Sequence, residues 1–346
     1  MDIVTPRFLV INVSRIGDTL LMTPAVRAIA VAYHGCEITL LAHPKRVEIL
    51  RNLPFVSSVG AIEKHRAPFL GRLGAKRYDY ALVYGHDVAL IEYALRVAHK
   101  VVAFRQSDAS LNARLHRVVE VPPLQTMHAV RIQLLLPAAL AIAPAGLRLA
   151  YQVTPGENSW ARTLLHERLP SQATPLIGLQ IASFPTKAYR DWPLENFIAL
   201  CERIRQRYPE AVFLIFGGKL ETQRTAALYE RFRERTLLFA GKLTLRQTAA
   251  LMNQVDLYVG VDTGPTHIMG ALGRPMVALY HGYSPSNVLA PLEHPALYVV
   301  DHPRAGKNCS PEVSMAEIDV DRVWDKVITA LSEHPPSGKL RAEGGS

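Results

Sequence analysis

Short apolar runs alternate with amphipathic segments along almost the whole chain. In the first 150 residues, the apolar runs that predict buried strands are 8–13, 38–42, 59–62, 80–84 and 101–104. Segments with helical periodicity follow them, at 19–33, 45–53, 87–98 and 127–143. Pro24 should kink the first helix or limit its opening turn, because proline has no backbone N–H. This alternation predicts a parallel sheet with helices on both faces.

A second alternating set begins near residue 175. Its predicted strands are 176–181, 212–216, 237–239, 257–261, 276–280 and 297–300, and its predicted helices are 194–207, 221–234, 245–254, 266–272 and 320–331. The region between the two sets is rich in Pro, Gly and polar residues around one helical stretch at 159–167, which is typical of a linker.

The sequence therefore predicts an α/β fold with two Rossmann-like parallel-sheet domains. The N-terminal domain spans 1–147, a linker spans 148–174, and the C-terminal domain spans 175–332. A polar tail over 333–346 is expected to be disordered. Two such domains should face a central cleft, where ligands collect at the carboxyl ends of the strands.

The composition, with 49% hydrophobic and 20% charged residues among 346, is that of a soluble globular protein. The longest apolar stretch, 134–147, is interrupted by Pro137 and Pro144, so no membrane span is predicted. The first residues lack the basic region of a signal peptide. Three widely separated cysteines suggest neither a disulfide framework nor a zinc knuckle. A cytoplasmic location is expected.

Most of the excess positive charge lies in the first half of the chain. Residues 1–150 contain 18 Lys and Arg against 10 Asp and Glu, a net charge of +8, whereas residues 151–346 contain 21 against 20. A basic surface attracts phosphates, acidic saccharides, anionic lipid headgroups or nucleic acid. Charges spread over many short segments also serve solubility alone, so both interpretations stay open.

The first candidate motif, 14–19, joins the first predicted strand to the first helix. Ser14 and Arg15 open this loop, and Gly17 permits a tight turn into the helix. Asp18 has two interpretations. It can cap the helix, or it can stand at the cleft as a carboxylate that takes a proton from an attacking hydroxyl. The G-x-G-x-x-G fingerprint is absent, which disfavours NAD binding.

The second motif, 261–267, follows the predicted strand 257–261. Gly264 lets a ligand approach the backbone, and the next residue is a proline, which suits a first helical position. The free N–H groups of a helix start favour an anion such as a diphosphate. Asp262, Thr263 and His267 add polar groups there. The local alternatives are a helix cap for Asp262 and a core histidine for His267. The clustering of these polar residues after one strand makes both alternatives less favourable.

The third motif, 183–187, follows the predicted strand 176–181. The hydroxyls of Ser183 and Thr186 and the ammonium of Lys187 suit phosphate oxygens. A solvated polar loop explains the same residues.

The fourth motif places Glu221 after a strand and the turn Gly217–Gly218. An acid in this position can accept hydrogen bonds from ribose hydroxyls. A favourable charge in the first turn of a helix is an equally good explanation.

No metal site is predicted. Asp319 and Asp321 have the D-x-D form of metal-dependent transferases, but they open the last predicted helix, so capping explains them better.

Two long stretches resemble the signatures of glycosyltransferase family 9, the ADP-heptose:lipopolysaccharide heptosyltransferases. The first, 8–28, reads FLVINVSRIGDTLLMTPAVRA, and the second, 258–280, reads YVGVDTGPTHIMGALGRPMVALY. The resemblance extends from about residue 8 to residue 331.

The resemblance implies a GT-B architecture that binds acceptor mainly through the N-terminal half and donor through the C-terminal half. It implies inverting transfer with no obligatory metal or cofactor, and a last helix that packs back on the first domain. By position, Asp18 matches the proposed base and Glu221 a ribose contact. Thr186 and Lys187 match diphosphate contacts. The loop around the donor's diphosphate and sugar is matched by Asp262, Thr263, Gly264 and His267.

Two departures from the family pattern lie beside the expected phosphates. Ile181 and Ala182 stand where members commonly have Pro-Gly, and four residues, 188–191, separate Lys187 from Trp192.

The sequence thus predicts an inverting transferase that moves heptose from ADP-heptose to a hydroxyl of the lipopolysaccharide inner core. Ser14, Arg15 and Gly17 are the acceptor-side candidates. The expected partners are a nucleotide-sugar, an anionic glycolipid and the inner face of the bacterial inner membrane, but not nucleic acid. The alternatives are another nucleotide-sugar donor, a protein acceptor, a nucleotide-sugar epimerase and a non-catalytic saccharide-binding protein.

Overall fold

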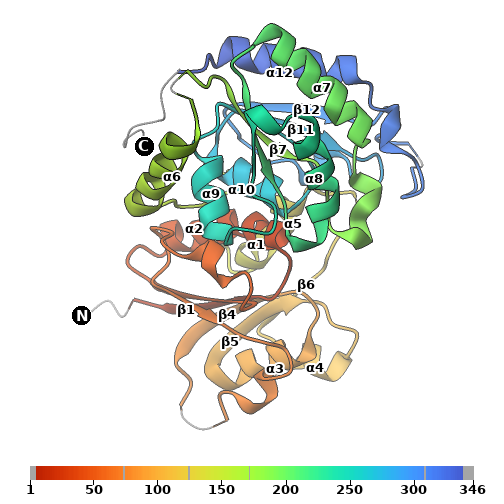
Figure 1. Ribbon diagram of the computed structural model, residues 1–346. Helices are drawn as coiled ribbons and strands as arrows, with labels where there is room; N and C mark the ends of the chain where they lie inside the picture. The colour runs from red at the N-terminus through yellow and green to blue at the C-terminus, as the bar shows by residue number, and fades with distance from the viewer. Residues whose placement is uncertain (1–4, 73–74, 124, 171, 308, 338–346) are drawn as a thin grey trace. The chain divides into compact units, whose positions relative to one another are not determined.

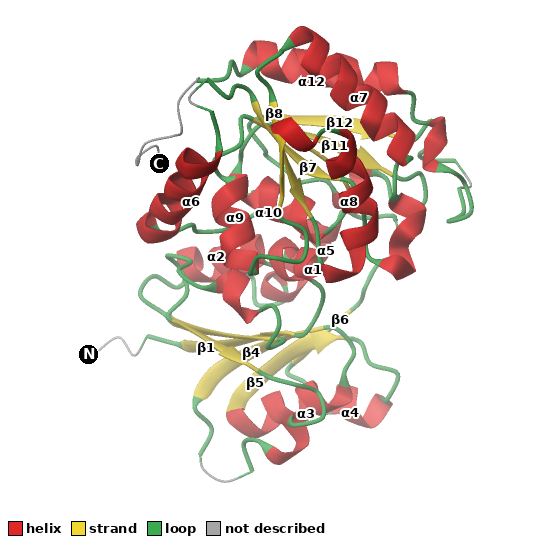
Figure 2. Ribbon diagram, in the orientation of Figure 1, coloured by secondary structure: helices red, strands yellow, loops and turns green. Residues whose placement is uncertain are grey.

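The chain forms two compact units, Met1–Gln152 and Val153–Ser346, in a computed structural model that describes residues 5–72, 75–123, 125–170, 172–307 and 309–337. Each unit is built on a six-stranded sheet in which every paired strand is parallel (Figures 1 and 2). The predicted α/β fold with two parallel-sheet domains is confirmed. Residues 338–346, most of the predicted disordered tail, lie outside the described residues.

The first sheet has the strand order β3-β2-β1-β4-β5-β6. Its strands are β1 Arg7–Asn12, β2 Glu37–Ala42, β3 Ser58–Ala61, β4 Tyr78–Tyr84, β5 Ala98–Phe104 and β6 Arg117–Val119. The central strand is buried from Phe8 to Ile11, as expected for a strand covered on both faces. The order reverses between β1 and β4, so the loops after these strands flank the crevice where ligands of such sheets bind.

Helices cover both faces of this sheet. In Figure 1, α1 Ile16–Leu21, α2 Thr23–Ala32 and α5 Ala129–Ala138 lie on one face, and α3 Val88–Val97 and α4 Ala109–Ala113 lie on the other. The predicted helix 19–33 is two helices that meet at Met22, two residues before Pro24, so the expected effect of the proline is confirmed. The predicted helix 45–53 is wrong: only the 3-10 turn η1 Val47–Leu50 forms there.

The second sheet has the order β12-β11-β10-β7-β8-β9, which is the same winding as in the first. Its strands are β7 Leu176–Gln180, β8 Val212–Phe216, β9 Thr236–Leu238, β10 Leu257–Val261, β11 Met276–Tyr280 and β12 Leu297–Asp301. Here the order reverses between β7 and β10. The crevice of this unit therefore lies after these two strands.

The helices of the second unit also cover both faces of its sheet. On one face, α7 Leu194–Arg207, α8 Thr222–Arg231 and α12 Val320–Glu333 contribute to one apolar core with the strands. On the other lie α9 Leu245–Met252 and α10 Gly264–Leu272 (Figure 2). The short helices are α11 Ser286–Leu289 and the 3-10 turns η3 Pro185–Arg190, η4 Lys219–Glu221, η5 Arg233–Arg235 and η6 Met315–Glu317.

Two segments near the predicted domain boundaries are structured parts of the second unit. Within 148–174, helix α6 Pro155–Arg168 starts with a capping box at Thr154 and Glu157. It packs on α9, where Arg246 Nε donates to Glu157 Oε1 at 2.7 Å. The last helix, α12, buries Val323 and Val327 in the core of the second unit.

Candidate active site

The second motif lies at the point where the strand order of the second sheet reverses. Gly260 in β10 pairs with Gln180 in β7, so the carboxyl ends of these strands are neighbours. Asp262 directly follows β10, and Ser183 follows β7 by three residues. The structure thus brings together motifs about 80 residues apart in the sequence.

Asp262 is a buried carboxylate held by two basic side chains. Its side chain is 1% exposed, Arg190 Nη1 lies 2.7 Å from Oδ2, and His267 Nε2 lies 3.4 Å from Oδ1. The same Arg190 nitrogen donates a hydrogen bond to the Asp262 carbonyl at 3.2 Å. Burial by itself raises the pKa of the Asp262 carboxyl, but His267 and Arg190 together hold that pKa below its ordinary value. The carboxylate is therefore ionised at neutral pH.

The start of α10 is held by its own side chains. Thr266 donates to the Val261 carbonyl at 2.5 Å and bonds the Tyr258 hydroxyl at 2.8 Å. Thr263 occupies the N-cap position but makes no side-chain capping bond. Because the first N–H groups of a helix have no partner within it, this start presents donors to an anion.

Beside this helix start, the buried imidazole nitrogen His267 Nδ1 has no hydrogen-bond partner in the described part of the chain. The side chain of His267 is only 7% exposed. Buried polar groups are rarely left unsatisfied without a reason. A polar ligand could satisfy this nitrogen, and the anion site at the start of α10 stays a prediction.

Arg190 is the cation of this site that the sequence analysis missed. Its guanidinium lies over the Tyr189 ring, 5.5 Å from the centroid, and contacts Asp262 as described. The predicted cation, Lys187, instead places its ammonium 5.6 Å from the centroid of the same ring. A signal existed: Arg190 lies in the inserted residues 188–191, two positions before Trp192. Arginine binds phosphate with two parallel hydrogen bonds, which suits this position.

The loop that carries Arg190 is anchored at both ends. Ser183 donates from its hydroxyl to the Lys187 carbonyl at 2.7 Å, and its backbone N–H donates to Asp191 Oδ1 at 2.7 Å. Trp192 is fully buried and donates from Nε1 to the Ile318 carbonyl at 2.8 Å. Thr186, in contrast, is exposed. Ser183 therefore orders the loop through its own hydrogen bonds.

Glu221 lies in η4, after the carboxyl end of β8. Its carboxylate accepts a hydrogen bond from the Gly218 N–H. Burial raises the pKa of this carboxyl, although the bond from Gly218 opposes the change. The local alternative, an acid in the first turn of a helix, is thus present. The remaining carboxylate oxygen has capacity for a ligand hydroxyl, so the ribose contact stays a prediction.

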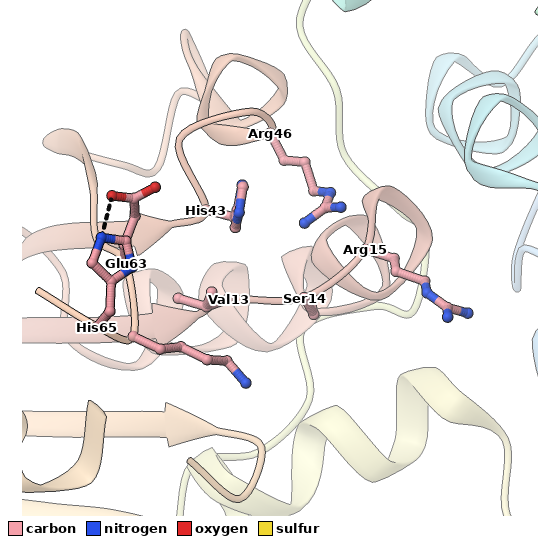
Figure 3. Close-up of a pocket in the computed structure, with 8 residues that line it drawn as sticks. Val13, Ser14, Arg15, His43, Arg46, Glu63 and His65 are labelled. Carbon is pink, nitrogen blue, oxygen red and sulfur yellow. Dashed lines mark ion pairs between the residues drawn. The ribbon is translucent and has the colours of Figure 1, made fainter. Parts of the chain in front are cut away.

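In the first unit, the loops after β1, β2 and β3 form an open pocket of about 400 Å³ (Figure 3). It is lined by Val13, Ser14, Arg15, His43, Arg46, Glu63, Lys64 and His65. Glu63 pairs with His65 at 3.4 Å, and Lys64 pairs with Asp87 at 3.2 Å. Three lysine and arginine side chains thus line the pocket against one carboxylate, so it suits an anion. Ser14 and Arg15 were predicted on the acceptor side, whereas the other cations were missed.

Asp18 is the third residue of α1, and its side chain is exposed. Arg15 occupies the N-cap position and no side-chain capping bond is made there, so the capping alternative for Asp18 is wrong. Burial and the charge of Arg15 lower the pKa of Arg46, and Asp18 opposes this shift. Asp18 therefore belongs to the electrostatic surroundings of the pocket. The turn between β1 and α1 is short, as expected, because β1 ends at Asn12 and α1 begins at Ile16. Gly17 lies inside α1 and is not among the residues with positive φ, so this turn does not depend on a left-handed glycine.

Among the described residues, no group of three or more His, Cys, Asp or Glu side chains is placed to hold a metal ion. Asp319 Oδ1 accepts a hydrogen bond from the Asp321 N–H at 2.9 Å and caps α12, as the capping explanation predicts. The described helices are all too short or too polar to cross a membrane.

The fold of the chain matches solved glycosyltransferase structures over most of its length. A family 9 glycosyltransferase from Veillonella parvula has a TM-score of 0.83 and 19% identity, with 96% of this chain and 99% of that one covered. The ADP-heptose lipopolysaccharide heptosyltransferase II of E. coli has a TM-score of 0.77 and 22% identity, with coverages of 94% and 99%. E. coli heptosyltransferase WaaC with ADP has a TM-score of 0.70 and 18% identity, with the same coverages.

These similarities establish the two-domain GT-B fold. A search of curated proteins finds no match to the sequence. The family model of glycosyltransferase family 9 (heptosyltransferase) matches residues 66–318, about three quarters of the chain. The chain therefore belongs to glycosyltransferase family 9 and is a glycosyltransferase.

Proposed function

We propose that this glycosyltransferase moves heptose from ADP-heptose to a hydroxyl of the lipopolysaccharide inner core, with inversion at the anomeric carbon. The observation that carries the donor side is the buried Asp262 carboxylate between Arg190 and His267 at the start of α10. Structures similar to this one are named for ADP-heptose, and WaaC is described with ADP and with ADP-2-deoxy-2-fluoro heptose.

In the proposed reaction, an acceptor hydroxyl oxygen attacks the anomeric carbon of the donor. The bond from this carbon to the diphosphate oxygen breaks, and the acceptor proton passes to Asp18. The leaving ADP gains negative charge, so groups that stabilise it lower the barrier. Arg190, His267 and the first N–H groups of α10 are proposed to do so. Asp262 holds Arg190 in position through the ion pair.

The acceptor side of the proposal rests on the basic pocket of the first unit. Lipopolysaccharide precursors carry anionic groups, and the pocket contributes Arg15, Arg46 and Lys64. Asp18 lies in the electrostatic surroundings of Arg46. A protein acceptor remains the alternative, and it would use the same base. We further propose that the enzyme works at the cytoplasmic face of the inner membrane, where such an acceptor is available.

Asp18→Asn tests the base assignment. Loss of general base catalysis lowers turnover by roughly 100-fold to 10,000-fold, while the affinity for ADP stays within about twofold. Turnover is followed as ADP release from ADP-heptose with a deacylated lipopolysaccharide precursor as acceptor. Calorimetry measures ADP binding. Wild-type turnover in the variant would remove Asp18 from the mechanism.

Donor identity is tested separately, because residues 188–191 depart from the family pattern. We expect ADP-heptose to bind more tightly than UDP- or GDP-linked sugars in calorimetric titrations. Incubation of the best donor without acceptor should give no isomer. Appearance of an isomer would support the epimerase alternative instead.

A further inference from the structure

The segment after β3 exposes large apolar side chains among cations. In η2 Ala67–Phe69, Phe69 is 72% exposed, and Leu70, the next residue, is 40% exposed. Arg66 and Arg72 flank them and are exposed. We call the segment 66–72, which exposes these four side chains, the 66–72 patch. Lys64, Lys76 and Arg77 on either side of it are exposed as well, and the one acid in 63–77, Glu63, pairs with His65.

Hydrogen bonds from arginines fix the backbone of the patch. Arg96, in α3, donates from Nη2 to the Ala67 carbonyl at 2.7 Å and from Nε to the Leu70 carbonyl at 3.0 Å. Arg72 donates from Nε to the Pro68 carbonyl at 2.7 Å. The 66–72 patch therefore has a defined conformation beside α3.

Packing under the patch fixes it further. Ala67 is fully buried in the core that includes Val97 of α3. Gly71 has φ of +66° and lies so close to α3 that a Cβ there would be 2.5 Å from Val97 Cγ1. The fold thus holds Phe69 and Leu70 outward with hydrogen bonds and packing. Exposed apolar groups surrounded by polar ones mark interaction sites.

The patch is continuous with the basic pocket along the chain. Lys64 and His65 line the pocket, and Arg66 follows directly. We propose that the 66–72 patch docks on an anionic lipid bilayer, with Phe69 and Leu70 in the interfacial region and Arg66 and Arg72 at the lipid phosphates. This inference rests on the proposed function in one respect: a lipid-linked acceptor would then present its anionic groups to the pocket beside the membrane.

Charge complementarity is the reason to choose a bilayer as the partner. The first 150 residues have a net charge of +8. Lysine and arginine side chains are attracted to an anionic membrane surface when they lie within about a Debye length of it. Phenylalanine and leucine insert into the headgroup boundary, where arginine remains hydrated. A protein partner or a second copy of the chain would require a complementary acidic face instead.

Vesicle sedimentation with the full chain tests the proposal without using catalysis. Vesicles of phosphatidylglycerol and phosphatidylethanolamine should bind the wild type, and vesicles of phosphatidylcholine alone should not. The double variant Phe69→Ser, Leu70→Ser should bind the anionic vesicles at least about tenfold more weakly, because two apolar side chains no longer insert. Val31→Ser is the matched control, since Val31 is 64% exposed on α2 of the same unit.

The outcomes separate the possible occupants. Equal binding of the wild type and the double variant to anionic vesicles would overturn the proposal, as would equal binding to both vesicle types. A wild type that dimerises in sedimentation velocity, with a monomeric double variant and no vesicle binding, would assign the patch to a second copy. Phe69→Trp adds a direct readout, because brominated lipids should quench its fluorescence beyond the wild-type level.

The same variants distinguish this inference from the proposed function. With deacylated acceptor in solution, the double variant should keep wild-type turnover, whereas with acceptor embedded in vesicles it should lose about tenfold. Wild-type protein that binds vesicles but transfers no heptose would refute the proposed function and leave the docking surface standing. Turnover on the deacylated acceptor with no vesicle binding would support the proposed function and refute the docking surface.

Discussion

The ion pair between Arg190 and Asp262 gives the most discriminating test of the donor site. Arg190→Met keeps the apolar stem of the side chain and removes its charge. It leaves a carboxylate that is 1% exposed, with the His267 imidazole 3.4 Å away as its other described ion-pair partner. Loss of one partner of a buried ion pair costs about 3 kcal/mol, and we take the lower end of the range because Arg190 itself is 19% exposed.

This cost should appear in the thermal unfolding of the second unit. For a unit of this size, about 3 kcal/mol corresponds to a fall in Tm of roughly 6–12 °C. Lys187→Met is the matched control, since Lys187 lies in the same turn over the same Tyr189 ring and has no contact with Asp262 among those described. Its effect should stay within about 0.5 kcal/mol, as for surface residues.

A double-mutant cycle isolates the pair. Asp262→Asn alone and in combination with Arg190→Met should give a coupling energy of about 2 kcal/mol. Calorimetry with ADP should show a loss of about tenfold or more in affinity for Arg190→Met and a smaller loss for Lys187→Met. The reasoning is refuted if Arg190→Met and Lys187→Met have the same Tm and the same ADP affinity. It is also refuted if the effects of Arg190→Met and Asp262→Asn on stability are additive.

Three further results follow from the same geometry. The pKa of Asp262 is lowered in the folded state, so the ionised carboxylate stabilises the fold above about pH 4, the ordinary pKa of Asp, and this stabilisation is lost as the pH falls below that value. The Tm difference between wild type and Asp262→Asn should therefore shrink from pH 7 to pH 3. A constant Tm difference would contradict this. His267→Ala should weaken ADP binding about tenfold and lower turnover, and unchanged affinity would move the diphosphate elsewhere. Trp192→Phe removes the bond to the Ile318 carbonyl and should destabilise the second unit by about 1–3 kcal/mol in urea unfolding, which an unchanged midpoint would exclude.

The arrangement of the core was readable from the sequence because parallel strands buried on both faces are continuous apolar runs. Thus 257–261 and 276–280 coincide with β10 and β11, and helix 194–207 coincides with α7. The pattern failed where burial is partial or the element is short. Strand β6 has three residues, none of them fully buried, and α4 has five. Local propensity does not fix such elements, and tertiary packing does.

The motifs of the candidate site were also readable, because polar residues and glycine directly after an apolar strand have few purely local explanations. The sequence alone determined that Asp262, Thr263 and His267 belong together, and it identified the family. Only the tertiary structure decided which cation faces Asp262. Lys187 and Arg190 are three residues apart in one loop, so the sequence offered both as cations that could face Asp262. The turn of η3 aims Arg190 at the carboxylate and leaves Lys187 over the Tyr189 ring.

The pocket of the first unit shows the same division. Arg15, Arg46 and Lys64 follow three different strands and are separated by up to 49 positions, so no spacing rule connects them. Parallel strands place their carboxyl ends at one edge of a sheet, and the order β3-β2-β1 then makes these loops neighbours. Sequence determined the charges and the strands that precede them. The strand order, which depends on long-range packing, decided that those charges line one pocket.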